Sequence, residues 1–217
     1  SNMIKLAEAI ASDQLKARIA IVISNRPCAG ITHAANRGFE TLVIERQSFT
    51  TRSDHERAVY DAITSSCADY VFLAGYMAIL SADFTRAFAG RLINIHPSLL
   101  PNFKGLDTHQ RAIKAQAKEH GTTVHLATAE LDEGPIILQA QLAILPEDDA
   151  DRLAKRVLQL EHHLYPFVLK CLCEGYLTLF ADQVTWQNPG RALQSASADT
   201  RYYLSSALKW PDRASHN

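Results

Sequence analysis

The chain has 217 residues, with 22 Lys and Arg against 23 Asp and Glu, so its formal net charge is −1. A hydrophobic content of 47% is too high for a disordered chain, and the balanced charge argues against a dedicated nucleic-acid binder. No apolar run approaches the roughly 18–20 residues needed to span a bilayer. We therefore expect one large domain, or at most two small ones, acting on small molecules rather than on nucleic acid or a membrane.

Four cysteines occur, at Cys28, Cys67, Cys171 and Cys173, and no two of them have the CxxC spacing of a metal or redox motif. A chain of this length does not need disulfides to hold its fold. We predict reduced structural thiols in a cytoplasmic protein.

Short apolar runs alternate with helical patterns along the chain, which is typical of an α/β fold. The predicted helices cover residues 3–13, 30–37, 53–67, 82–89, 107–119 and 149–174. The predicted strands cover residues 19–23, 41–44, 70–74, 92–95, 122–126, 136–145 and 177–180. Most strands are continuously apolar, so we predict a Rossmann-like, mostly parallel sheet with helices on both faces.

The two ends of the chain differ from this pattern. The N-terminus runs directly into a helix, whereas a doubly wound sheet usually begins with a strand and a Gly-rich turn. The first strand and its loop are therefore expected to be missing from this sequence. After residue 184 the chain is rich in Ser, Ala and Gln. We predict a catalytic domain in residues 1–184 and a loosely packed C-terminal extension in residues 185–217.

The segment around residues 92–101 carries the first candidate site. Asn94 and His96 are two residues apart on a predicted strand, so their side chains point to the same face, and Pro97 ends the strand. Open α/β sheets bind ligands at the carboxyl ends of their strands. A strand end that merely meets solvent is the alternative, but the paired Asn and the following Lys104-Gly105 favour a site.

A second candidate lies in the loop Leu131-Asp132-Glu133-Gly134-Pro135. A carboxylate in such a loop can reach a histidine on a neighbouring strand, although Asp beside Gly is also a common turn. His125, on the preceding strand, is interpreted as a buried core residue or as a partner of the site. A mononuclear metal site made of His96, His125 and Asp132 is conceivable on residue type but is not favoured.

Six ordered stretches together resemble the formyltetrahydrofolate-dependent formyltransferase family. They are Leu73–Met77, Asn94–Pro101, Lys104–His109, His120–His125, Leu131–Pro135 and Glu161–Pro166. The resemblance is closest to members that formylate the amine of glycinamide ribonucleotide (GAR) in purine biosynthesis. It implies transfer of a formyl group from 10-formyltetrahydrofolate, used as co-substrate, without a metal. The sequence is compatible with a homodimer but does not define the oligomeric state.

The resemblance also implies roles for the candidate residues. Asn94 donates its amide N–H to the oxyanion, His96 acts as a cationic donor and general acid, and Asp132 assists His96 in moving the proton. Losing one oxyanion donor typically costs a factor of about 10²–10³ in rate. The family's folate site corresponds to Arg52, Met77, Ile79, Leu80 and Asn94. Ala78 replaces the Arg usual in the family, which leaves only backbone contact at that position.

The resemblance further implies a GAR site that consists of Ser1, Asn2 and Glu161, with Glu161 accepting from the ribose hydroxyls. Leu158 replaces a Gln often found nearby. Ser1-Asn2 aligns with the end of the family's phosphate-binding loop, so we expect native residues to precede Ser1. A Ser-Asn remnant of a cleaved tag before a native Met3 is the alternative.

Two other functions stay open at this point. A formyltetrahydrofolate deformylase is the second enzyme compatible with the motifs, and formate release without GAR distinguishes it. A non-catalytic folate- or nucleotide-binding module is the third reading, because the phosphate loop is not recognised in the sequence.

Overall fold

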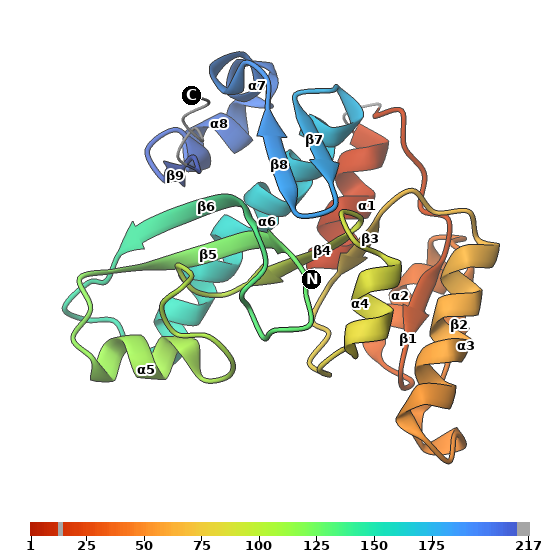
Figure 1. The fold of residues 1–217 in the computed structure, drawn as a ribbon. Coiled ribbons are helices and arrows are strands. Elements are labelled where there is room, and N and C mark those ends of the chain that lie inside the picture. The colour runs from red at the N-terminus through yellow and green to blue at the C-terminus, as the bar shows by residue number, and fades with distance from the viewer. Residues whose placement is uncertain (13–14, 212–217) are drawn as a thin grey trace.

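Helices and strands alternate along most of the chain (Figure 1) in a computed structural model that describes residues 1–12 and 15–211. The helices are α1 (Asn2–Ser12), α2 (Ala29–Asn36), α3 (Arg52–Ser65), α4 (Ala82–Ala87), α5 (Thr108–Lys114), α6 (Ala150–Cys173), α7 (Pro189–Ser195) and α8 (Ala198–Leu204), with a short 3₁₀ helix at Arg46–Ser48. The strands are β1 (Val22–Ser24), β2 (Thr41–Val43), β3 (Val71–Leu73), β4 (Leu92–His96), β5 (Glu119–Leu126), β6 (Ile136–Ala143), β7 (Leu177–Phe180), β8 (Gln183–Trp186) and β9 (Leu208–Lys209).

The larger sheet has the strand order β3-β4-β5-β6-β9. β3 and β4 pair in parallel, and β5 and β9 run antiparallel to their neighbours, so β3, β4 and β6 point in the same direction. β1 and β2 form a separate parallel pair, and β7 and β8 form a hairpin. The expected α/β class is thereby confirmed.

Helix ends follow local chemistry that the sequence already indicates. The Thr51 hydroxyl accepts from the Asp54 N–H at the start of α3, and Asp149 accepts from Arg152 N–H at the start of α6. The helix predicted over 107–119 is too long, because α5 ends at Lys114 and Gln116 has a φ of 51°. A residue with positive φ cannot continue a right-handed helix. The chain then enters β5 earlier than expected.

Alternate residues of β4 face opposite sides of the sheet. Ile93 and Ile95 pack into the main core with α1 and α6, whereas Leu92 packs on the other side with α3 and α4. This confirms that helices cover both faces, and Figure 1 shows α6 running behind β4, β5 and β6. Asn94 and His96 share the α3–α4 side with Leu92 because strand side chains alternate.

The edges of β1 and β3 face a large apolar cavity rather than each other. Among the described residues β1 pairs only with β2, and β3 pairs only with β4. The cavity has a volume of about 1980 Å³, and its lining includes Leu6, Val22, Val71 and Leu169. The expected first strand thus has no counterpart among residues 1–12 and 15–211, and the cavity lies between the β1-β2 pair and the larger sheet.

The C-terminal segment is better packed than its composition predicts. α7 and α8 bury Ala192 and Leu204 completely, and β9 pairs with the edge of β6. The indole N–H of Trp186 donates to the carbonyl of Ile137. All four cysteines are free thiols; Cys28 and Cys67 are exposed, Cys171 is buried and Cys173 is half-buried. Within the described part of the chain, no helix combines the length and hydropathy required for crossing a bilayer.

Tyr165 joins α6 to the sheet, and its removal gives a first test of the fold. Its hydroxyl is fully buried and lies 3.0 Å from the carbonyl of Leu73 and 2.9 Å from that of Ile93. Tyr165→Phe should lower the free energy of unfolding by about 1–3 kcal/mol, because a buried hydrogen-bonding group loses its partner. Urea unfolding followed by circular dichroism measures this. Tyr202→Phe, at a residue that is 79% exposed, serves as control. Equal unfolding midpoints for the two variants would contradict a stabilising role of the Tyr165 hydroxyl.

Candidate active site

The pairing of β4 with β5 assembles the first half of the site. Asn94 lies opposite His125, and His96 lies opposite Thr123. Side chains directly opposite each other in antiparallel strands point to the same face. The adjacent strands therefore place an amide, two imidazoles and a hydroxyl side by side at the carboxyl end of β4. The expected common orientation of Asn94 and His96 is compatible with this register.

The contacts of His125 define the state of its ring. Its Nδ1 lies 2.9 Å from the carbonyl oxygen of Leu126, which can only accept, so Nδ1 carries the proton. Burial lowers the pKa of His125, and the ring is therefore neutral near pH 7. Its Nε2 is then an acceptor for the Asn94 Nδ2–H, 3.2 Å away. The amide of Asn94 keeps a second N–H and its oxygen for other partners.

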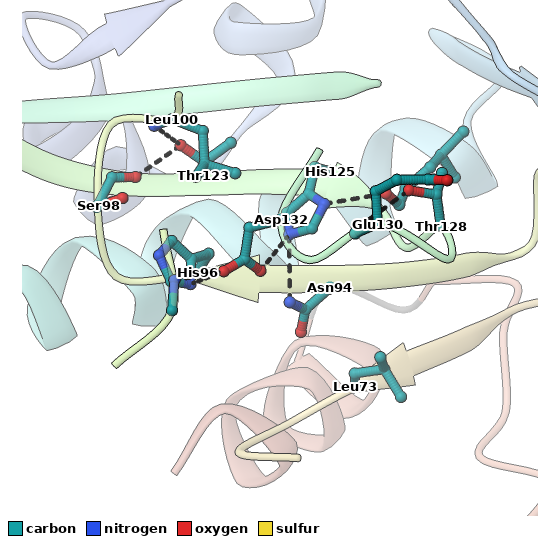
Figure 2. A network of polar contacts seen from close by, with 12 residues as sticks. Leu73, Asn94, His96, Ser98, Leu100, Thr123, His125, Thr128, Glu130 and Asp132 are labelled. Carbon is teal, nitrogen blue, oxygen red and sulfur yellow. Dashed lines mark hydrogen bonds and ion pairs between the residues drawn. The ribbon is translucent and has the colours of Figure 1, made fainter. Parts of the chain in front are cut away.

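Asp132 completes the cluster from the loop between β5 and β6. Its side chain is 7% exposed, and its φ of 54° shows the left-handed turn that Asp tolerates better than most residues. Oδ2 lies 3.4 Å from His96 Nδ1 and accepts from the Gly105 N–H at 2.9 Å, and Oδ1 lies 3.7 Å from His125 Nε2. Figure 2 shows the carboxylate between the two rings, with the Asn94 amide beside His125.

His96 is held between two acceptors. Its Nε2 lies 3.0 Å from the carbonyl of Phe103, while Nδ1 faces Asp132. The loop after β4 is itself anchored, because the Thr123 hydroxyl donates to the Ser98 carbonyl at 2.7 Å and accepts from the Leu100 N–H at 3.0 Å (Figure 2). Both ring nitrogens of His96 therefore have an acceptor within reach.

A small pocket of about 120 Å³ opens beside this cluster. Its lining includes Asn94, His125 and Asp132 on one side and the segment after β3 on the other. The predicted folate residues Met77, Ile79, Leu80 and Asn94 all line it. Met77 and Ile79 are 79% and 59% exposed, which makes that wall apolar and accessible.

Arg52 contacts the pocket wall rather than the pocket itself. Its Nη2 donates to the carbonyl oxygen of Ile79, and its Nε donates to Glu56 Oε1 at 2.8 Å. Arg52 is not among the pocket-lining residues, although its side chain stays half exposed. The structure thus places Arg52 next to the predicted folate residues and gives it protein partners there.

The residues predicted for GAR meet at the large cavity. Asn2 Nδ2 donates to Glu161 Oε2 at 2.8 Å, and the Asn2 Oδ1 is buried without a partner among the described residues. Burial raises the pKa of Glu161, and the bond from Asn2 opposes that shift. Ser1, Asn2, Leu158 and Glu161 line the cavity. Its lining also includes Met77 and other residues of the smaller pocket, so the two recesses adjoin.

Three contacts of the site are not predicted by the sequence patterns. They are the Phe103 carbonyl that faces His96, the Gly105 N–H that holds Asp132, and the acid Glu56 beside Arg52. The backbone groups carry no residue-type signal. Glu56 does, because it follows Arg52 by four residues, the spacing at which helical side chains meet.

Buried histidines give the fold a pH dependence. Burial, with the nearby His109 and His96 charges, lowers the pKa of His120 from 6.5 to about 4, and burial also lowers the pKa values of His109 and His125. Between pH 6.5 and 4 the unfolded chain binds protons that the folded protein does not. The free energy of unfolding should therefore fall on acidification, by up to about 1.4 kcal/mol per pH unit for each such histidine. Urea titrations across this range measure the slope; His120→Gln should reduce it, and a flat profile would contradict the prediction.

The arrangement indicates a class of chemistry. An amide, an imidazole and a carboxylate converge at strand ends of an α/β sheet, next to a pocket with one apolar wall. Such a set can stabilise a tetrahedral oxyanion and move a proton. Across residues 1–12 and 15–211, no three His, Cys, Asp or Glu side chains are grouped so as to hold a metal ion. Fold and site together define an enzyme of the acyl-group-transfer class.

Comparison with known proteins specifies the family. The sequence model described as Formyl transferase matches residues 1–169, which is most of the chain. The chain belongs to the formyl transferase family.

Relatives and solved structures agree with this assignment. The chain is 42% identical over 180 residues to the phosphoribosylglycinamide formyltransferase of Haemophilus influenzae, covering 82% of this chain and 85% of that protein. A phosphoribosylglycinamide formyltransferase structure from Coxiella burnetii, in complex with CHES, superposes with a TM-score of 0.80 at 39% identity, covering 85% of this chain and 88% of the other. A formyltetrahydrofolate deformylase from Burkholderia mallei matches with a TM-score of 0.77 at 29% identity, covering 86% of this chain and 66% of the other.

Proposed function

We propose that this protein transfers the formyl group of 10-formyltetrahydrofolate to the amine of glycinamide ribonucleotide. The observation that carries the proposal is the convergence of Asn94, His96 and Asp132 beside the small pocket. The relatives named above support the choice of substrates, because they are phosphoribosylglycinamide formyltransferases.

The proposed reaction gives each residue a task. The substrate amine attacks the formyl carbon, a C–N bond forms, and the formyl oxygen takes up negative charge. The free N–H of Asn94 donates to this oxyanion, and a protonated His96 stabilises it by its positive charge. The amine loses a proton, the bond to the folate nitrogen breaks, and that nitrogen receives a proton. Asp132, 3.4 Å from His96, is the group placed to accept and return the proton, directly or through water.

The two substrates are assigned to the two adjoining recesses. The small pocket, lined by Met77, Ile79, Leu80 and Asn94, is assigned to part of the heteroaromatic ring system of the formyl donor. Glu161 and Asn2 offer an acceptor and an amide for hydroxyl groups in the large cavity. All these residues lie before residue 184, which supports placing the catalytic unit in residues 1–184.

Two assays test the proposal. Purified protein with both substrates should yield formylated GAR, detected by mass spectrometry, and 10-formyltetrahydrofolate alone should yield no formate. Formate release without GAR would instead identify a deformylase, the activity named for the Burkholderia mallei structure. Binding of both ligands without either product would identify a non-catalytic binding module.

A further inference from the structure

Glu56 is a buried acid that connects α3 to the segment after β3. The residue is 8% exposed, and its Oε1 accepts from the Arg52 Nε at 2.8 Å and from the Ser81 backbone N–H at 3.0 Å. Arg52 also donates to the carbonyl oxygen of Ile79. One carboxylate and one guanidinium therefore fix the backbone on both sides of Leu80.

The segment they hold, residues 75–81, is irregular and largely exposed. It contains neither helix nor strand, and it begins at Gly75, whose φ of 69° lies in the left-handed region. The side chains of Met77 and Ile79 are mostly exposed, so burial does not anchor them. Leu80 is half-buried and packs against the cluster of Ile63, Phe84 and Phe88, and the polar contacts of Glu56 and Arg52 hold the backbone on both sides of it. At the far end, the Ser81 hydroxyl accepts from the Phe84 N–H and starts α4.

The charge on Glu56 strengthens these contacts. Burial alone would raise its pKa, but hydrogen bonds from Ser81 and Arg52 outweigh burial and hold the pKa below its ordinary value. The acid is therefore ionised near pH 7, and hydrogen bonds to an ionised acceptor are stronger than neutral ones. Burial and the Glu56 charge raise the pKa of Tyr76, which places that charge close to the same segment.

We propose that Glu56 is a positioning residue: through Arg52 and the Ser81 N–H it holds residues 75–81 in the conformation that forms the apolar wall of the small pocket. This inference rests on the proposed function insofar as that pocket takes the formyl donor. Glu56 itself does not line the pocket, so it acts on the donor only through the segment.

Substitutions at Glu56 separate positioning from catalysis. Glu56→Ala should raise KM for 10-formyltetrahydrofolate by about tenfold to a hundredfold, because charge-assisted hydrogen bonds are lost. The kcat and the KM for GAR should stay within about twofold. Glu56→Gln retains an oxygen acceptor and should recover part of the loss. The matched control is Asp83→Asn, which removes the exposed i,i+3 ion pair with Arg86 on the neighbouring helix and should change neither constant.

Hydrogen exchange supplies a readout that does not depend on activity. In Glu56→Ala, and less in Glu56→Gln, a peptide covering residues 75–84 should exchange at least about tenfold faster than in the wild type, while peptides from β5 and α6 keep their rates. If the wild type transfers no formyl group to GAR, the proposed function fails, and exchange still decides whether Glu56 holds the segment. Unchanged exchange and an unchanged KM would overturn the inference. A general loss of kcat and thermal stability, with no selective change in residues 75–84, would also overturn it.

Discussion

Replacing Asn94 or His96 by alanine should lower kcat by about 10²–10³-fold or more, because the first change removes a preorganised donor to the oxyanion and the second removes the positive charge beside it. Both side chains lie on one face of β4, so neither substitution should disturb the core on the other face. Steady-state rates with both substrates saturating measure the effect. The KM values should change much less than kcat, since the lost interaction is made mainly in the transition state.

Asn94→Asp sharpens this test. The shape is nearly unchanged, but a carboxylate replaces the N–H donor, and it would meet both the oxyanion and Asp132 with like charge. We expect a loss at least as large as that of Asn94→Ala. His33→Ala, on the exposed face of α2, serves as control and should keep the wild-type rate. Rates near wild type in the Asn94 variants would contradict the role of Asn94 as a donor to the oxyanion.

Asp132→Asn is the second substitution with a large expected effect. The new side chain can still accept from the Gly105 N–H, so the loop is expected to keep its conformation. It no longer carries the charge that faces His96 and His125, and it cannot take up a proton. We expect kcat to fall by about 10²–10⁴-fold, the range for loss of a general acid or base, with little change in either KM.

The neighbouring acid provides a matched control for Asp132→Asn. Glu133 is half exposed and pairs with Lys104 at 2.7 Å, on the surface of the same loop. Glu133→Gln should leave kcat within about twofold of the wild type. Equal losses in the Asp132 and Glu133 variants would show that the loop, rather than the Asp132 carboxylate, is what the reaction requires.

Much of the fold is predictable from local patterns in the sequence. The apolar runs locate β1 to β7, and the polar residues Thr51 and Asp149 mark the starts of α3 and α6 where the structure has them. Strand direction is not encoded in such runs. The side-chain pattern of β5 is compatible with parallel or antiparallel pairing, so its antiparallel pairing with β4 and β6 emerges only in the structure.

In the candidate site too, local relations are predictable from the sequence and tertiary contacts are not. Alternation along one strand is enough to predict that Asn94 and His96 face the same way, because that relation is local. The orientation of Asn94 by His125 depends on the register between two strands, and the contact of Glu56 with Ser81 joins residues 25 positions apart. Such contacts require the tertiary fold. The polar composition of the C-terminal segment does not predict its packing. A few small or apolar residues, such as Ala192 and Leu204, are enough to bury it against the core.

The most direct measurement compares two folate analogues. One carries a hydrated aldehyde that mimics the tetrahedral adduct, and the other is identical but lacks that group. If Asn94, His96 and Asp132 are complementary to the adduct, the wild type should bind the hydrated analogue at least about 100-fold more tightly, and His96→Ala should abolish most of that preference. Equal affinities of the wild type for the two analogues would contradict the account.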